Sequence, residues 1–457
     1  MLLRFTIENL FCFAGETVFS MVAGKDEEHS EHKCHLRDSY EHEALCAAAL
    51  YGANAHGKTK LVEAIAFARN LILEGRRPGQ SIPVSTFRLD AEKLGQPSYC
   101  EFVIFHLGVE YTYGFLANNT RIEEEWLFAR PDGEEVRYFE RLTDNQGHTQ
   151  IEFGSALSSL ESEDNKFIEY VAKGTRDNQL FLTEAIERNI EVLKPIYSWF
   201  LNTLTIVPTN REIESLVIRA YEDSDFRNFI SSFLKLANTG IDTISIEEKS
   251  LNFDKLLISK RSKYAFASEE FIKEFENDIA DGLASQIESE GRKLSEAVRP
   301  SVNGQMLICL KTVHNDNQGN AVPFDIDEES SGTQRIMQIL PVLADMRETS
   351  KVYVVDELDR MLHPLLSRLF LETFLKLNKN NKNQLIFTTH ETSLLNLDLL
   401  RRDEIWFVEK ARSGSSQLYS LADFEFKPNP AIKLERGYLQ GRFGGIPFIG
   451  DIRSLGW

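Results

Sequence analysis

Residues 52–59 read Gly-Ala-Asn-Ala-His-Gly-Lys-Thr, which matches the G-x-x-x-x-G-K-S/T pattern of a phosphate-binding loop. Gly52 and Gly57 allow the backbone to turn so that its N–H groups face an anion, and Asn54 lies in the same cradle. Lys58 is predicted to reach the β- and γ-phosphates, and Thr59 to offer its hydroxyl to Mg²⁺. The pattern therefore predicts a site for ATP with its magnesium ion.

The segments on both sides of this loop are those of a strand–loop–helix unit. Residues 47–51 are apolar and few, as in a buried strand, and residues 61–68 contain good helix formers. Such a helix directs its positive N-terminal end at a bound phosphate. The alternative is a glycine turn before an ordinary helix, and these flanks disfavour it.

A second candidate lies far along the chain, where an apolar run ends in two acids. Residues 352–355 indicate a strand buried on both faces, followed by Asp356 and Glu357. The carboxyl end of such a strand is where α/β sheets bind ligands. Asp356 is predicted to hold the Mg²⁺ shell beside Thr59, and Glu357 to polarise the attacking water. Alone, the pattern would also fit a strand that leads into a solvated turn.

Two further segments surround the acidic strand. Ser331, Gly332 and Thr333 precede it, and residues 384–389 form another apolar run that ends at His390. The plain interpretation of the first is an N-cap before a helix that opens at Gln334 and is kinked or ended by Pro341. The plain interpretation of His390 is a capped or core histidine.

In this order the segments resemble the ABC-type ATPase superfamily, in the branch of DNA-repair and chromosome-organising ATPases. That branch has a Ser-Gly-Gly-like signature before the acidic strand and a switch histidine after the next strand. The resemblance implies that Ser331, Gly332 and Thr333 contact the nucleotide of a partner subunit, with Thr333 replacing the usual second glycine. It implies catalysis by Glu357 with His390, and a homodimer or higher homo-oligomer with shared ATP sites.

The resemblance leaves two assignments open. The dimer-contact loop of the family often carries Leu-Asp after the acids, and either Leu358-Asp359 or Leu362-His363 would occupy that place. The Q-loop glutamine is unassigned, and Gln179 is one candidate among several.

Composition bounds the remaining possibilities. The 457 residues suffice for two or three domains, and the net charge of −19 disfavours general nucleic-acid binding without deciding whether DNA or RNA is bound. The apolar runs are all too short for a membrane span. Five scattered cysteines favour reduced thiols and a cytoplasmic location.

The segment 29–35, followed by His42 and Cys46, contains zinc-ligand types, but its spacing favours a charged, solvated loop.

The expected fold is α/β: an ABC-type P-loop ATPase head with an antiparallel β subdomain and a helical insertion. We divide the chain into an N-terminal ATPase lobe with the phosphate loop and antiparallel sheet (1–163), a helical insertion (164–303) and a C-terminal ATPase lobe (304–457). The last helix of the insertion is expected within about 268–298, which is too short for the long coiled coils of the resembled ATPases.

Residues 434–448 resemble a smaller group of ATPases within this superfamily. Residues 434–448, with 87–90 and 362–364, look like ATPases of bacterial phage-defence and abortive-infection systems (the RloA, AbiL and PARIS AriA type), which are related to OLD and SMC/Rad-type ATPases. This implies a cytoplasmic ATP hydrolase that acts as a sensor or scaffold, controls a separate toxic effector such as a nuclease, and responds to a phage protein. The alternatives are a DNA-repair or chromosome-maintenance ATPase, and a scaffold that binds ATP without turnover.

Overall fold

The computed structural model describes residues 1–37, 42–144, 146–158, 162–209, 214–251, 296–301, 304–347, 350–380, 382–425 and 434–447. The helix expected within 268–298 lies outside these residues. The chain forms two compact units: unit 1 comprises Met1–Thr209, Met346–Asp359 and Phe370–Trp457, and unit 2 comprises Asn210–Asp345 and Arg360–Leu369. The division at residues 163 and 303 stays a proposal.

Unit 1 contains a six-stranded sheet in the order β11-β16-β17-β5-β18-β19. Its strands are β11 (Leu204–Val207), β16 (Val352–Val355), β17 (Gln384–Thr388), β5 (Ala47–Tyr51), β18 (Ile405–Lys410) and β19 (Ser416–Ser420). All neighbours are parallel except the edge pair β18–β19. Every residue of β5, β16 and β17 is buried, which explains why these strands read as continuous apolar runs.

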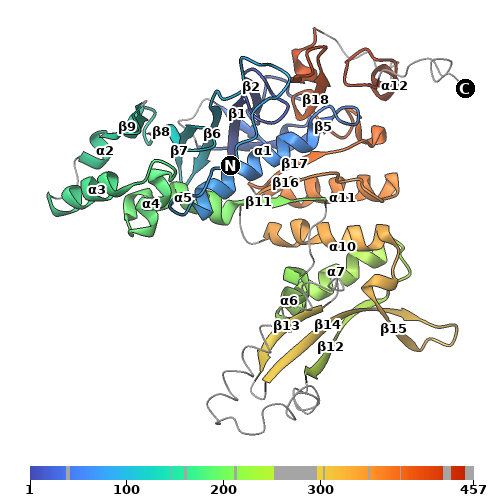
Figure 1. The fold of residues 1–457 in the computed structure, drawn as a ribbon. Coiled ribbons are helices and arrows are strands. Elements are labelled where there is room, and N and C mark those ends of the chain that lie inside the picture. The colour runs from blue at the N-terminus through green and yellow to red at the C-terminus, as the bar shows by residue number, and fades with distance from the viewer. Residues whose placement is uncertain are drawn as a thin grey trace, which may run out of the picture. The chain divides into compact units, whose positions relative to one another are not determined.

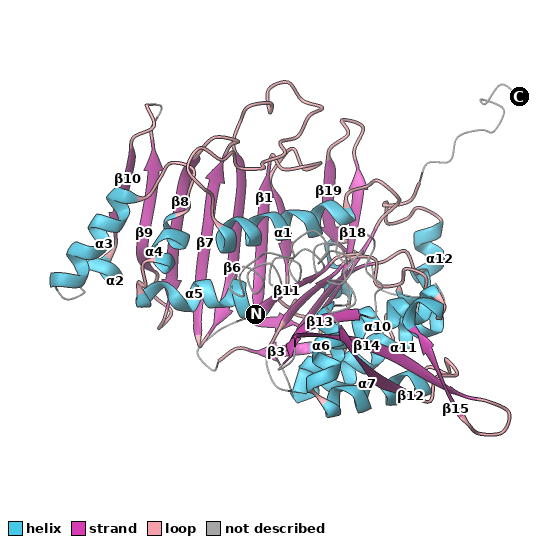
Figure 2. Ribbon diagram, turned by 60° about the horizontal axis from the view of Figure 1, so that its bottom comes forward, coloured by secondary structure: helices cyan, strands magenta, loops and turns pink. Residues whose placement is uncertain are grey.

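A seven-stranded antiparallel sheet adjoins it, in the order β10-β9-β8-β7-β6-β1-β2 (Figure 2). Its strands are β1 (Leu2–Glu8), β2 (Thr17–Ser20), β6 (Ser98–His106), β7 (Val109–Ala117), β8 (Ile122–Arg130), β9 (Val136–Thr143) and β10 (Thr149–Phe153). Strand β1 pairs with β2, β6 with β7 and β8 with β9, and each of these antiparallel pairs joins strands that are consecutive or close in the sequence.

Helix α1 (Lys58–Glu74) follows β5 and supplies the core that both sheets share (Figure 1). Its buried side chains Leu61 and Ile65 belong to the same cluster as Phe5 of β1 and Leu50 of β5. The other elements of this unit are β3 (Lys33–His35), β4 (Glu43–Leu45), α2 (Ser155–Ser158), α3 (Ser162–Gly174), α4 (Phe181–Glu187), α5 (Lys194–Ser198) and α12 (Leu434–Leu439). Helix α11 (Pro364–Leu377) begins in unit 2 and ends in unit 1.

Unit 2 combines helices with a second small sheet. Its elements are α6 (Glu214–Glu222), α7 (Ser224–Leu236), β12 (Thr243–Leu251), β13 (Glu296–Ser301), β14 (Gly304–Asn315), β15 (Ala321–Asp325) and α10 (Ser331–Ala344). Helix α7 has an apolar face that is buried at Phe226, Ile230 and Phe233. The insertion 164–303 is thus helical only in part, because β11, β12 and β13 lie within it. Strand β12 begins with the period-two alternation of a strand.

The structure confirms the predicted class, a mixed α/β fold with a P-loop strand–loop–helix unit and an antiparallel sheet. Within the described residues, no helix is long and apolar enough to cross a membrane.

Candidate nucleotide-binding site

The loop between β5 and α1 needs both of its glycines for packing reasons. A Cβ on Gly52 would lie 2.5 Å from the carbonyl oxygen of Val408, so the neighbouring strand β18 excludes any side chain there. Gly57 has φ of +115°, and a Cβ there would lie 2.7 Å from Oγ of Ser416. Between them, Asn54 is exposed. The loop therefore presents its backbone in the open, tightly curved form that anion binding requires.

Lys58 lies at the start of α1 with its ammonium turned back onto the loop. Its Nζ donates to the carbonyl oxygens of Gly52 at 2.6 Å and Ala53 at 3.3 Å, and the residue is only 6% exposed. Burial lowers the pKa of Lys58 to about 8, while the negative charges of Asp356 and two further acids act in the opposite direction. The ammonium is thus poorly solvated and would gain from an anionic ligand.

Asp356, directly after β16, is the centre of a hydroxyl cluster. It is 3% exposed, and its Oδ1 accepts from Thr388 at 2.7 Å and from Thr59 at 3.3 Å. Its Oδ2 accepts from Thr209 at 2.8 Å. The pairing of Asp356 with the helix-start hydroxyl of Thr59 is the one predicted for a magnesium site. A carboxylate and hydroxyls are ligands that suit Mg²⁺.

Thr209 and Thr388 were not anticipated from the sequence. Each follows or ends an apolar strand, β11 and β17 respectively, so each lies at the same sheet edge as Asp356. The available signal was this position at a strand's carboxyl end, but it becomes useful only once the strand order is known.

Glu357 adopts a left-handed backbone conformation, with φ of +47°. Non-glycine residues avoid this region, and a residue kept there commonly marks a functional site. The N–H of Glu357 donates to Oγ1 of Thr388 at 2.7 Å, which holds the turn. The chain thereby turns sharply after the buried Asp356, and Glu357 is only partly buried.

His390 follows β17 and contacts the acidic loop through its backbone. Its N–H lies 3.2 and 3.3 Å from the two carboxylate oxygens of Asp359. The pKa of His390 is lowered, mainly by burial and then by the charge of Lys58, against the opposing acids. The imidazole is therefore neutral near pH 7, and its side chain can accept or donate a hydrogen bond. Of the two candidate Leu-Asp positions, Asp359 is the one that contacts the histidine loop.

Strand order explains why these residues meet. Strands β16, β17 and β5 are neighbours and parallel, so their carboxyl ends form one edge. That edge brings Lys58 and Thr59 to Asp356, although about 300 positions separate them in the sequence. Glu357 and His390 lie at the same edge.

Ser331, Gly332 and Thr333 belong to unit 2 and begin α10. Ser330, not Ser331, is the N-cap: its Oγ accepts from the N–H of Thr333 at 3.1 Å. A Cβ on Gly332 would lie 2.8 Å from the carbonyl oxygen of Met361, so this glycine is required for close packing. The hydroxyl of Thr333 is buried and bonds to Ser330, whereas Ser331 is exposed.

The expectations for this helix need correction. It begins at Ser331, three residues before the expected Gln334, because Ser330 supplies the cap. It is not ended by Pro341 but continues to Ala344. Its buried apolar face extends past the proline to Val342 and Leu343, and this packing maintains the helix.

Gln179 is wrong as a Q-loop candidate. Its Oε1 accepts from the N–H of Arg76 at 2.6 Å, beside the glycine that ends α1. The phosphate loop precedes the other end of this helix, and 17 residues at about 1.5 Å each separate the ends by roughly 25 Å. Gln179 therefore lies at the end of α1 that is far from the phosphate loop.

The tail packs against the phosphate loop. A Cβ on Gly445 would lie 3.6 Å from Cα of Gly52, and the carbonyl oxygen of Gly445 accepts from the hydroxyl of Tyr438 at 3.1 Å. Thr392, just after His390, donates to Glu435 of α12 at 2.7 Å. Residues 434–447 thus connect the start of the loop with the segment that follows the histidine.

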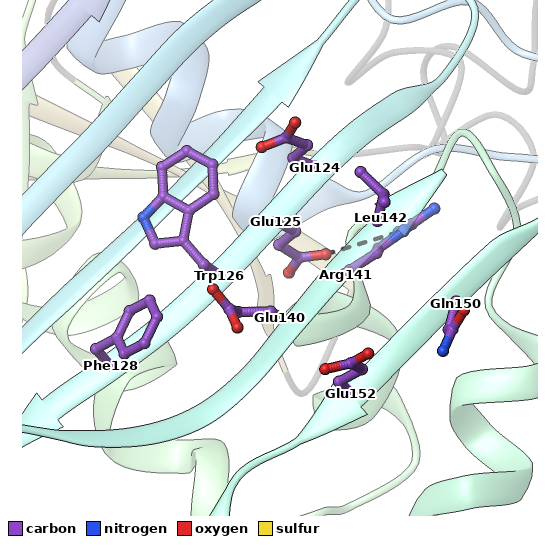
Figure 3. Close-up of a pocket in the computed structure, with 9 residues that line it drawn as sticks. All are labelled: Glu124, Glu125, Trp126, Phe128, Glu140, Arg141, Leu142, Gln150 and Glu152. Atoms are coloured by element: carbon purple, nitrogen blue, oxygen red, sulfur yellow. Dashed lines mark ion pairs between the residues drawn. The ribbon is translucent and has the colours of Figure 1, made fainter. Parts of the chain in front are cut away.

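A hollow of about 540 Å³ lies elsewhere, on strands β8, β9 and β10 (Figure 3). Its glutamates are Glu124, Glu125, Glu140 and Glu152. The single lining cation, Arg141, is paired with Glu125 at 3.6 Å. This acidic surface would repel phosphates, so it does not compete with the loop as a nucleotide site.

Three of the solved structures that are similar to this chain are Smc head domains. The SMC head domain from Thermotoga maritima is 12% identical, covers 92% of this chain and 98% of its own, and has a TM-score of 0.36. An SmcHead bound to the C-winged helix domain of ScpA is 11% identical, with coverages of 92% and 97% and a TM-score of 0.38. An Smc head domain with an extended coiled coil, bound to the C-terminal domain of ScpA derived from Pyrococcus furiosus, is 14% identical, with coverages of 96% and 98% and a TM-score of 0.33.

Among curated proteins no match was found. One family description does match, over residues 47–396: "AAA domain, putative AbiEii toxin, Type IV TA system". The matched span contains the phosphate loop, the acidic strand and His390. Membership of this family implies ATP binding and hydrolysis. This chain belongs to that family of AAA-type P-loop ATPases.

Proposed function

We propose that this protein binds ATP with Mg²⁺, hydrolyses it, and thereby controls a separate toxic effector in bacterial anti-phage defence. The observation that carries the ATP chemistry is the convergence of Lys58, Thr59, Asp356, Glu357 and His390 on one edge of the parallel sheet. The defence role rests on the family match and on the resemblance of the tail.

The surroundings of each of these residues support a specific role in ATP binding or hydrolysis. The loop N–H groups and Lys58 bind the phosphates, and Thr59 with Asp356 holds Mg²⁺. Glu357 directs the attacking water, since its carboxylate extends from a sharply turned position beside the buried metal ligand. His390 remains neutral and hydrogen-bonds the γ-phosphate, and its place is fixed by the contact with Asp359.

Ser331, Gly332 and Thr333 complete the site of a partner subunit in a homodimer or higher oligomer. The exposed Ser331 and the N–H groups at the start of α10 form a helix N-terminus suited to an anion. Closure of two subunits on ATP would then bring the signature of each chain to the loop of the other.

The ATP assignment is tested by Lys58→Ala, with Lys60→Ala as the matched control. Lys60 is two residues away on the same helix, exposed, and paired with Glu63. We expect calorimetry to show that ATP affinity is lost in the first variant and unchanged in the second. Equal affinity in both variants would refute the site.

The effector role is tested in cells that express the chain with the product of a neighbouring gene. We expect the two proteins to copurify, and phage infection to release toxicity only when Lys58 is intact. If instead the purified chain binds duplex DNA tightly at moderate salt and has no effect on toxicity, the DNA-maintenance alternative is favoured.

A further inference from the structure

A short segment before β3 in unit 1 brings together two imidazoles and a carboxylate. One ligand atom from each of His29, Glu31 and His32 lies within 4.8 Å of the others. The sequence favoured a charged, solvated loop here, but His32 is only 5% exposed, so that expectation fails at this residue. A buried imidazole needs defined partners for both ring nitrogens.

The first partner of His32 is a buried carboxylate. Nδ1 of His32 lies 3.0 Å from Oε2 of Glu404, which is fully buried and also accepts from the N–H of Arg401 at 2.8 Å. When Glu404 is ionised, this oxygen has no proton to donate, so it accepts its second hydrogen bond from Nδ1–H of His32. This leaves the lone pair on Nε2 of His32. A carboxylate that orients a histidine in this way is the usual outer partner of a metal-binding imidazole.

His29 is oriented in the same manner by a carbonyl group. Its Nε2 lies 2.7 Å from the carbonyl oxygen of Leu397, which can only accept, so Nε2 carries the proton. The lone pair is then on Nδ1, which lies 3.8 Å from Oε1 of Glu31. The two imidazole rings are stacked, with centroids 4.9 Å apart. Both histidines therefore keep one unprotonated nitrogen in the same small region.

These three side chains also line a hollow of about 300 Å³. Glu372 and Asp398 line it as well, together with Lys376 and Lys379. Three carboxylates and two ammonium groups therefore line the hollow. Its lining has a formal net charge of −1 when the histidines are neutral, which favours a bound cation. The hollow has room for water or a further carboxylate as additional ligands.

We propose that His29, Glu31 and His32 bind one divalent ion of the zinc class. Two imidazoles with one carboxylate suit zinc and its neighbours better than Mg²⁺, which prefers oxygen ligands. Tetrahedral zinc with bonds of about 2.0–2.1 Å sets its nitrogen ligands about 3.3 Å apart. Because the three ligand atoms now lie within 4.8 Å of one another, they must approach by at most about 1.5 Å. The ion would secure this segment against Leu397 and Glu404, directly before β18.

The test uses the full chain after removal of metals by a chelator, with excess Mg²⁺ to saturate oxygen-rich sites. Co²⁺ is titrated as a spectroscopic probe, and zinc content is measured after dialysis. We expect one ion per chain, with the intense visible absorption of low-coordinate cobalt. His29→Gln and Glu31→Gln, both at least partly exposed positions, should each weaken Co²⁺ binding at least tenfold.

The matched control is His35→Gln, an exposed histidine three residues beyond His32. It should bind Co²⁺ like the wild type, and thermal unfolding without metal should be alike in all variants. If Co²⁺ binds equally well to the wild type and to His29→Gln, the ion lies elsewhere. If neither Co²⁺ nor Zn²⁺ binds at micromolar concentration, the proposal is wrong.

Discussion

ATP affinity should fall as the pH rises through 8, because of Lys58. In the free protein, burial lowers the pKa of this ammonium to about 8. A bound triphosphate would raise that pKa, so binding takes up a proton wherever the free lysine is neutral. The favourable charge is almost fully available well below pH 8, is halved near pH 8 and is lost progressively above it. Between pH 7 and pH 9 the protonated fraction falls from about nine-tenths to about one-tenth, so affinity should drop roughly tenfold.

The assay is calorimetric titration with ATP at several pH values, with Mg²⁺ in excess so that the nucleotide complex keeps a constant charge. Lys58→Arg is the matched variant, because a guanidinium remains protonated throughout this range. The ATP affinity of this variant should be lower at every pH, because the planar guanidinium fits the loop poorly. That affinity should change little between pH 7 and pH 9. A flat profile for the wild type, or an equal fall in Lys58→Arg, would refute the reasoning.

Three further outcomes follow from the geometry of the sheet edge. Glu357→Gln should keep ATP binding and slow hydrolysis by roughly a hundredfold, as seen in single-turnover assays, because the candidate base is lost while Asp356 is spared; unchanged turnover would indicate another base. Thr388→Val should lower the free energy of unfolding by about 2 kcal/mol in denaturant titrations, because it removes a buried hydrogen bond of 2.7 Å to a carboxylate; no change would show that the bond contributes nothing. Lys58→Ala and Ser331→Arg should each be inactive alone, yet regain about one active site per mixed dimer after subunit exchange; a mixture no more active than its components contradicts shared sites.

The local chemistry of the phosphate loop could be predicted from contiguous residues alone. The pattern from Gly52 to Thr59 depends on contiguous residues, and backbone conformation there follows from glycine and helix-start preferences. The buried strand before Asp356 and the hairpins of the antiparallel sheet were likewise readable, because side-chain periodicity and turn residues act over a few positions. The fold class followed from these elements.

Which distant residues meet could be seen only in the folded chain. The hydroxyls of Thr209 and Thr388 became partners of Asp356 because the strand order places β11, β16 and β17 side by side. No local pattern encodes that order, since it depends on which apolar faces pack together. The same holds for Gln179. Its place at the far end of α1 depends on the path of the folded chain and cannot be predicted from the residues next to it in the sequence.

The segment around His32 illustrates why burial of polar residues cannot be predicted from the local sequence. Its sequence is polar and charged, which predicts a solvated loop, and no metal-ligand spacing marks it. Burial arises because Glu404 and Leu397, more than 350 positions away, supply the hydrogen bonds that orient the two histidines. A polar side chain can be buried when a partner satisfies it, and that partner is known only from the folded chain.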